Sequence, residues 1–121
     1  MKQRILVVEN NQTILELIGI VLEDAGYEVK LYTTEKAILS HIINFQPDAI
    51  LLDIFKPTIE GTELCRQLKE AQSTAHIPVI VLSTHPQIAK VKEICADEIV
   101  PKPFDIDGLL DVLKDQLKTA S

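Results

Sequence analysis

The stretch from Asp48 to Asp53 constrains the fold of this chain most, because it runs through three consecutive large apolar residues directly into a carboxylate. A continuous apolar run of this kind is typical of a strand that is buried on both faces, and such strands belong to parallel sheets covered by helices. In an open parallel sheet the binding crevice lies beyond the carboxyl ends of the strands, which is where Asp53 would lie. Pro57 and Gly61 then predict a loop. Asp53 is therefore the first candidate for chemistry.

Further strands and helices alternate along the whole chain. Apolar or alternating runs predict strands at 5–8, 28–32, 48–53, 78–82 and 98–100, with the alternating run at 28–32 at or near a sheet edge. Helical spacing of apolar residues predicts helices from about 11 to 25 and at 34–44, 62–73, 86–95 and 106–118. Asn10 or Asn11 can cap the first helix, Gly26 can end it, and Asp105 can cap the last. This alternation predicts right-handed crossovers and an α/β fold with a doubly wound, five-stranded parallel sheet.

The composition is that of one soluble globular domain spanning residues 1–121. Apolar residues make up 46% of the chain and charged residues 25%, and the formal net charge is −6. A negative chain argues against direct nucleic-acid binding, which favours a basic surface. The apolar runs are too short for a signal peptide or a membrane span, so we expect a cytoplasmic protein without membrane contact.

The two cysteines, Cys65 and Cys95, lie thirty residues apart, and each falls within an apolar helical pattern. This placement favours buried thiols in a reducing compartment over a metal-binding pair or a disulfide.

Polar residues follow most of the predicted strands and are expected to converge at one edge of the sheet. These residues are Glu9, Asn10, Asp53, Ser83 and Lys102. Four of them also have a structural interpretation. Asp53 could be a loop carboxylate, Lys102 a solvated lysine and Ser83 a helix cap, and Glu9 could form a purely structural ion pair with Lys102.

From Ile5 to Leu117 the chain resembles the receiver domain of two-component response regulators, of the chemotaxis-regulator type. The motifs that carry the resemblance occur in order as Val7-Val8-Glu9-Asn10, Leu51-Leu52-Asp53 with Pro57 and Gly61, Leu82-Ser83, and Lys102-Pro103-Phe104. The resemblance implies a flavodoxin-like (βα)5 fold with strand order 2-1-3-4-5. It also implies a signalling domain and not an enzyme. At most, such a domain catalyses its own phosphorylation and dephosphorylation.

The same resemblance assigns roles to the converging residues. Asp53 would accept a phosphoryl group from a histidine kinase or a histidine phosphotransfer protein, Lys102 would pair with that group, and Ser83 would hydrogen-bond it. A Mg²⁺ ion would be held by Glu9, Asn10, Asp53 and the backbone carbonyl of Phe55. Pro103 would follow a cis peptide bond that directs Lys102 inward.

Several positions depart from the family pattern. Asn10 replaces the second acid that closes the first strand, which predicts weak Mg²⁺ binding. Ile99 replaces an aromatic residue whose rotation, in the family, signals phosphorylation to a downstream protein. The face that would carry this signal consists of residues 86–95, 99 and 106–118. Thr84 is larger than the usual residue beside the pocket and would narrow access to it. Phe55 and His85 occupy positions that would restrict water entry.

Two other functions compete with the phosphoacceptor interpretation. A pseudo-receiver would use the same fold as a phosphorylation-independent interaction module, and Asn10 and Ile99 give that alternative its support. A flavodoxin-like enzyme or nucleotide binder shares the architecture but needs a glycine-rich phosphate loop after the first strand. Residues 10–13 contain no glycine, which disfavours that class.

Overall fold

The computed structural model describes residues 2–120 and contains one parallel sheet with strand order β2-β1-β3-β4-β5. The strands are β1 (Arg4–Val8), β2 (Glu28–Tyr32), β3 (Ala49–Asp53), β4 (Val79–Ser83) and β5 (Glu98–Pro101). The helices are α1 (Gln12–Asp24), α2 (Ile38–Phe45), α3 (Glu63–Glu70), α4 (Lys90–Ile94) and α5 (Ile106–Ala120). The predicted fold class and strand order are confirmed.

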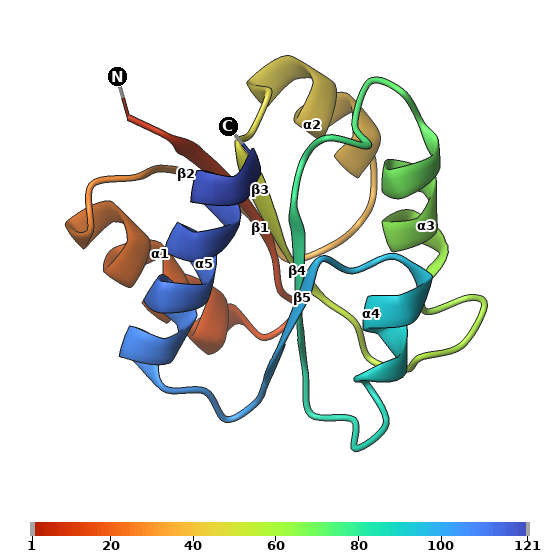
Figure 1. Cartoon of the computed structure of the whole chain (residues 1–121). Helices are drawn as coiled ribbons and strands as arrows, with labels where there is room; N and C mark the ends of the chain where they lie inside the picture. The colour runs from red at the N-terminus through yellow and green to blue at the C-terminus, as the bar shows by residue number, and fades with distance from the viewer. Residues whose placement is uncertain (1, 121) are drawn as a thin grey trace.

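Helices cover both faces of the sheet, with α1 and α5 on one side and α2, α3 and α4 on the other (Figure 1). Successive residues of a strand point to opposite faces, so each central strand supplies two hydrophobic cores. In β3, Leu51 packs with the α1 and α5 side, whereas Ile50 and Leu52 pack with the other side. Burial on both faces explains why this strand reads as an uninterrupted apolar run.

The ends of α1 and α5 follow the predicted capping residues. The side chain of Asn11 accepts a hydrogen bond from the Ile14 N–H at 3.0 Å, and Asp105 accepts one from the Gly108 N–H at 3.2 Å. After α1 the chain turns at Gly26, whose φ of 97° lies in the left-handed region that glycine adopts without a steric penalty. The two hydrogen bonds fix where α1 and α5 begin, and the turn at Gly26 fixes where α1 ends.

Helices α2, α3 and α4 are shorter than predicted, and α3 ends at Glu70 instead of at residue 73. Before α2, the Thr34 hydroxyl accepts a hydrogen bond from the Lys36 N–H, and Ala37 has a φ of 58° that a helix cannot continue through. Before α4, the hydrogen bonds from Ile88 N to His85 O and from Val91 N to Ile88 O close tight three-residue turns. The predicted segment at 86–95 is therefore helical only over Lys90–Ile94.

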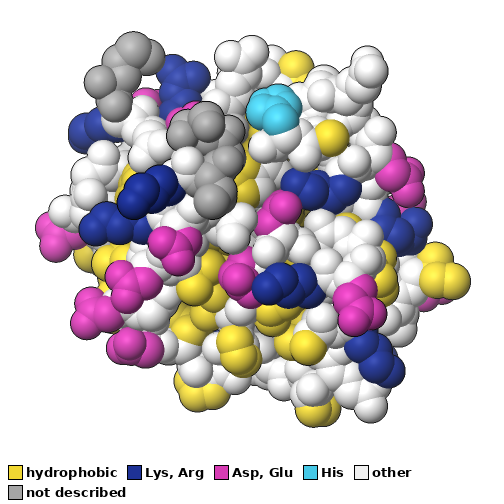
Figure 2. Space-filling model, viewed as in Figure 1, with side chains coloured by type: hydrophobic (Ala, Val, Ile, Leu, Met, Phe, Trp, Pro, Cys, Tyr) yellow, Lys and Arg dark blue, Asp and Glu magenta, His cyan; other side chains and the backbone are white. Residues whose placement is uncertain are grey.

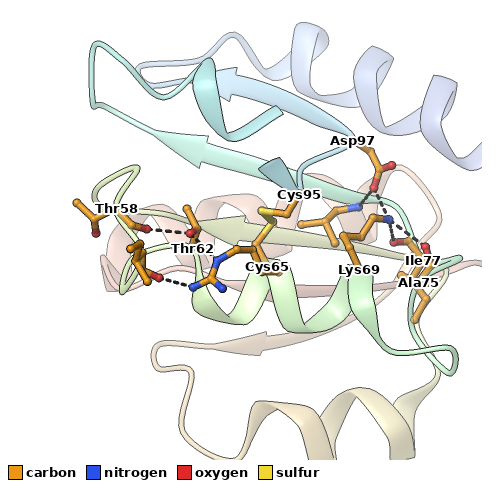
Figure 3. Close-up of a disulfide and its surroundings, with 11 residues drawn as sticks. Thr58, Thr62, Cys65, Lys69, Ala75, Ile77, Cys95 and Asp97 are labelled. Carbon is orange, nitrogen blue, oxygen red and sulfur yellow. Dashed lines mark hydrogen bonds and ion pairs between the residues drawn. A yellow bond between two sulfur atoms is a disulfide. The ribbon is translucent and has the colours of Figure 1, made fainter. Parts of the chain in front are cut away.

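The prediction of buried thiols is wrong, because Cys65 and Cys95 form a disulfide with a Cα–Cα distance of 5.7 Å. Figure 3 shows that this bond joins α3 to the residue that follows α4. Beside it, Lys69 Nζ lies 2.7 Å from an oxygen of Asp97 and donates hydrogen bonds to the carbonyls of Ala75 and Ile77 (Figure 3). The two apolar helical patterns place both cysteines on the same side of the sheet, which brings the sulfur atoms together.

On the face seen in Figure 2, acidic and basic side chains are interspersed, and hydrophobic side chains emerge between them. Among residues 2–120, no helix has the length and apolar character needed to cross a bilayer.

Candidate functional site

The carboxyl ends of the strands bring three of the predicted charged residues into direct contact. Lys102, which follows β5, places its Nζ 2.5 Å from Glu9 Oε1 and 3.2 Å from Asp53 Oδ1. Glu9 follows β1, and Asp53 is the last residue of β3. Two carboxylates thus share one ammonium group, which leaves a net formal charge of −1 at this edge of the sheet.

The two carboxylates lie in different surroundings. Glu9 is fully buried, and its Oε2 accepts a hydrogen bond from the Asn11 N–H at 3.0 Å. Its Oε1 accepts no hydrogen bond, so the charge of Lys102 is the partner of that oxygen. Asp53 is partly exposed and lines an open hollow. The arrangement fixes Glu9 internally while Asp53 faces the space where a ligand can enter.

The backbone around Lys102 directs its side chain toward these carboxylates. Its N–H donates a hydrogen bond to the carbonyl of Ser83 at 2.8 Å, which continues the pairing of β4 with β5. The peptide bond between Lys102 and Pro103 is cis, as the resemblance implied.

The hollow beside Asp53 has a volume of about 360 Å³. Its lining includes Asn10, Thr34, Glu35, Asp53, Phe55 and Gly61. Asn10 and Phe55 thus lie where the sequence placed them, beside Asp53, whereas Glu9 and Thr84 do not line this hollow.

Ser83 and Thr84 occupy different environments at the end of β4. Ser83 is buried, and its hydroxyl oxygen accepts a hydrogen bond from the His85 N–H at 3.1 Å. This hydrogen bond closes a local turn; because α4 begins only at Lys90, the alternative that Ser83 caps the next helix is wrong. Thr84 is exposed.

Glu35 is a member of the site that the sequence did not indicate. It lies in the loop between β2 and α2, and the pKa of its carboxyl is raised by partial burial and by the negative charges of Glu63 and Asp53. A lone acidic residue in a polar loop carries no motif, so only the tertiary arrangement reveals its position beside Asp53.

The loop after Asp53 is held in shape by Gly61. A Cβ atom at this position would clash with the backbone carbonyl oxygen of Lys56. The Gly61 N–H donates a hydrogen bond to the Thr58 hydroxyl oxygen at 3.0 Å. The glycine therefore allows the loop to close tightly beneath the hollow.

The oxygen atoms around the hollow match the ligand preference of Mg²⁺. They include the carboxylate of Asp53 and the side-chain amide of Asn10. Mg²⁺ prefers oxygen ligands and keeps several waters when a protein supplies only one or two carboxylates. Within the described part of the chain, no group of three or more His, Cys, Asp and Glu side chains is arranged as a metal site. The donor set fits a largely hydrated Mg²⁺ ion.

Residues 5–114 match the family model of the response regulator receiver domain. The chain is 34% identical to the DNA-binding dual master transcriptional regulator RpaA of Synechocystis sp., over 88% of this chain and 46% of the relative. It is also 34% identical to the response regulator ArlR of Staphylococcus saprophyticus, over 95% of this chain and 52% of that protein. The chain thus spans about half the length of the curated relatives it matches.

Solved structures show the same fold. The CheY-like receiver domain protein from Methanospirillum hungatei superimposes with a TM-score of 0.86 and 28% identity, covering 99% of this chain and 97% of that one. The signal receiver domain of a histidine kinase from Syntrophus aciditrophicus gives a TM-score of 0.84 and 29% identity, covering 97% and 91%.

Proposed function

Because the chain belongs to the response regulator receiver domain family, we propose that its Asp53 accepts a phosphoryl group from a phosphohistidine of a partner protein. The observation that carries this proposal is the placement of Asp53, which contacts Lys102 on one side and lines an open hollow on the other. The donor would be a histidine kinase or a histidine phosphotransfer protein.

The protein contributes to the transfer mainly by positioning the reacting groups and neutralising their charge. A carboxylate oxygen of Asp53 forms a bond to phosphorus as the bond between phosphorus and the histidine nitrogen breaks, and the departing imidazole keeps the electron pair. Lys102 lies 3.2 Å from Asp53 Oδ1, so its ammonium group can balance the negative charge of the phosphoryl oxygens. The Ser83 hydroxyl oxygen accepts the His85 N–H, and its own hydrogen would donate to a phosphoryl oxygen of the product.

Receiver domains generally bind Mg²⁺ at their acidic pocket, and here Asp53, Asn10 and the carbonyl of Phe55 would hold the ion. When bound, the ion supplies further charge neutralisation to the phosphoryl oxygens. The Glu9 carboxylate would act mainly through its ion pair with Lys102, because both of its oxygens already have partners inside the protein.

The signal would pass to a downstream protein through the face formed by α4, β5 and α5. Ile99 lies in β5 and is partly buried against the hydrophobic core beneath α4. An aliphatic side chain there can repack but has no polar end to respond to burial, so we expect a small response of this face to phosphorylation. We expect the protein to work in the cytoplasm, without binding nucleic acid through this domain and without catalysis beyond its own phosphorylation and dephosphorylation.

The proposal is tested by treating the chain with a small-molecule phosphodonor and Mg²⁺ and measuring its intact mass. We expect a gain of about 80 Da per phosphoryl group, lost in Asp53→Asn. Asp48→Asn is the matched control, because Asp48 accepts a hydrogen bond from the Arg4 N–H at the far end of the sheet. An unlabelled parent chain would instead support the pseudo-receiver alternative, and a labelled Asp53→Asn chain would place the phosphoacceptor elsewhere.

A further inference from the structure

Helix α2 is apolar on two sides. Ile38 and Ile42 are buried against the sheet, as the predicted helical pattern requires. Leu39 and Ile43 point away from that core and are 41% and 60% exposed. Exposed apolar residues are common singly, but a pair at helical spacing beside a hollow marks a candidate contact surface.

A groove runs between α2 and α3 and contains these two residues. It consists of three hollows of about 210, 410 and 360 Å³. The first and second share Leu39 and Gln67, and the second and third share Ile43, Ser73 and Thr74. Because neighbouring hollows share lining residues, they form one continuous groove, which we call the α2–α3 groove.

The α2–α3 groove is acidic. Its lining includes Glu35, Glu60, Glu63 and Glu70, and no lysine or arginine of the described chain lines any of the three hollows. Burial, and after it repulsion from Glu63 and Asp53, raises the pKa of the Glu35 carboxyl, so Glu35 and Glu63 lie close enough to repel each other. The nearby Lys69 is directed at Asp97 instead, as Figure 3 shows.

We propose that the α2–α3 groove binds a cationic amphipathic helix of a partner protein. The exposed Leu39 and Ile43 would receive the apolar face of that helix, and the four glutamates would pair with lysines or arginines beside it. Helix α2 has eight residues and is about 12 Å long, so it can contact about two turns of the partner helix. A second copy of this chain is a poor occupant, because each copy carries a net charge of −6.

Asp53 does not line the α2–α3 groove, so the proposal can be tested on the unphosphorylated chain. The probe is an acetylated, amidated peptide of about 14 residues with leucine at every third or fourth position, lysine flanking the leucines and alanine elsewhere. A second peptide carries glutamate in place of each lysine. Backbone amide chemical shifts of the intact chain are followed during titration with each peptide. We expect saturable shifts confined to α2 and α3 with the lysine peptide, weakening as salt is added.

Variants of the chain distinguish binding in the α2–α3 groove from unspecific electrostatic attraction of the peptide. Leu39→Ser with Ile43→Ser should weaken binding about tenfold or more, since both side chains are already exposed and their loss leaves the core intact. Glu63→Gln with Glu70→Gln should weaken it about threefold at low salt. The matched control is Leu17→Ser with Ile20→Ser, an exposed apolar pair on α1 that should leave binding unchanged.

Four outcomes would overturn the proposal. The lysine peptide could cause no saturable shift, the glutamate peptide could bind equally well, or the α1 variant could lose as much affinity as the α2 variant. Sedimentation could also show a dimer that Leu39→Ser with Ile43→Ser dissociates, in which case the occupant is a second copy of this chain.

Discussion

At the scale of single residues, Lys102 connects a fully buried carboxylate to a partly exposed one. Glu9 is enclosed on all sides, whereas Asp53 faces the hollow, and the same ammonium group lies against both. Lys102 therefore has a structural role that exists before any phosphoryl group arrives. The two interpretations drawn from the sequence, ion pair and phosphoryl partner, are compatible in one side chain.

Lys102→Met is expected to destabilise the fold by about 3–5 kcal/mol, because it leaves the buried Glu9 carboxylate without its cation. Adding Glu9→Gln to that variant should restore most of the loss, since the remaining side chain is neutral. Urea unfolding of the parent, both single variants and the double variant measures the coupling between the two residues. Equal stabilities of Lys102→Met and the double variant would show that Glu9 is not stabilised by this pair.

Asn10→Asp is expected to tighten Mg²⁺ binding, because it adds a carboxylate to the hollow beside Asp53. In water, a divalent ion and one negative charge about 4 Å apart attract each other by roughly 2 kcal/mol. This energy corresponds to an increase in affinity of about tenfold to thirtyfold. Titration calorimetry measures the change. Asn44→Asp adds the same charge on the remote helix α2 and should have no effect. An unchanged affinity in Asn10→Asp would mean that residue 10 does not reach the ion.

At the scale of elements, the sequence predicts strands better than helices here. The strands of this sheet are defined by short apolar or alternating runs, and all five lie within two residues of their predicted ends. The start of α2 and the length of α4 depend on backbone turns at Ala37 and His85. The spacing of apolar residues along the sequence does not indicate these turns. Hydrophobic periodicity reports which face is buried, but it does not report where a helix begins.

The residues of the candidate site likewise fall into those that the sequence predicts and those that it does not. Asp53, Asn10 and Lys102 were predictable because each lies at or just after the carboxyl end of a strand, and parallel strands end at one edge. Glu35 was not, because its loop approaches Asp53 only after β2 and α2 have packed. The pairing of Cys65 with Cys95 likewise depends on how α3 and α4 lie beside each other, which spacing along the chain does not specify.

Gly61→Ala is expected to destabilise the chain by about 1–3 kcal/mol, because the new methyl group would meet the Lys56 carbonyl oxygen in the loop between β3 and α3. Gly108→Ala is the matched control. The added methyl group there meets only Asp105 side-chain atoms at 3.6–3.7 Å, and alanine favours helix, so this variant should gain about 0.5–1 kcal/mol. Thermal unfolding of both variants tests the pair. A neutral Gly61→Ala would mean that the loop rearranges without cost.

At the scale of the whole molecule, the disulfide encloses α3, β4 and α4 in one covalent ring with a sequence separation of 30 residues. Closing a loop of this length reduces the conformational entropy of the unfolded chain. In the entropic model this raises the free energy of unfolding by about 3–4 kcal/mol. Reduction with a dithiol should lower the free energy of unfolding by about this amount. Cys65→Ser with Cys95→Ser should be insensitive to the reductant, and a parent chain with the same stability before and after reduction would contradict the prediction.

Glu35 belongs to two hollows, the one beside Asp53 and the first of the α2–α3 groove. Any ligand that changes the charge beside Asp53 therefore changes the electrostatic potential at the groove. A bound Mg²⁺ ion would lower the attraction of the groove for a cationic helix, whereas a phosphoryl group of about −2 would raise that attraction. For a reversibly bound ion, thermodynamic linkage makes the effect reciprocal, so an occupied groove would alter the affinity of the Asp53 hollow for Mg²⁺ by the same factor. Through the one glutamate that lines both hollows, the fold would couple binding at the groove to binding beside Asp53.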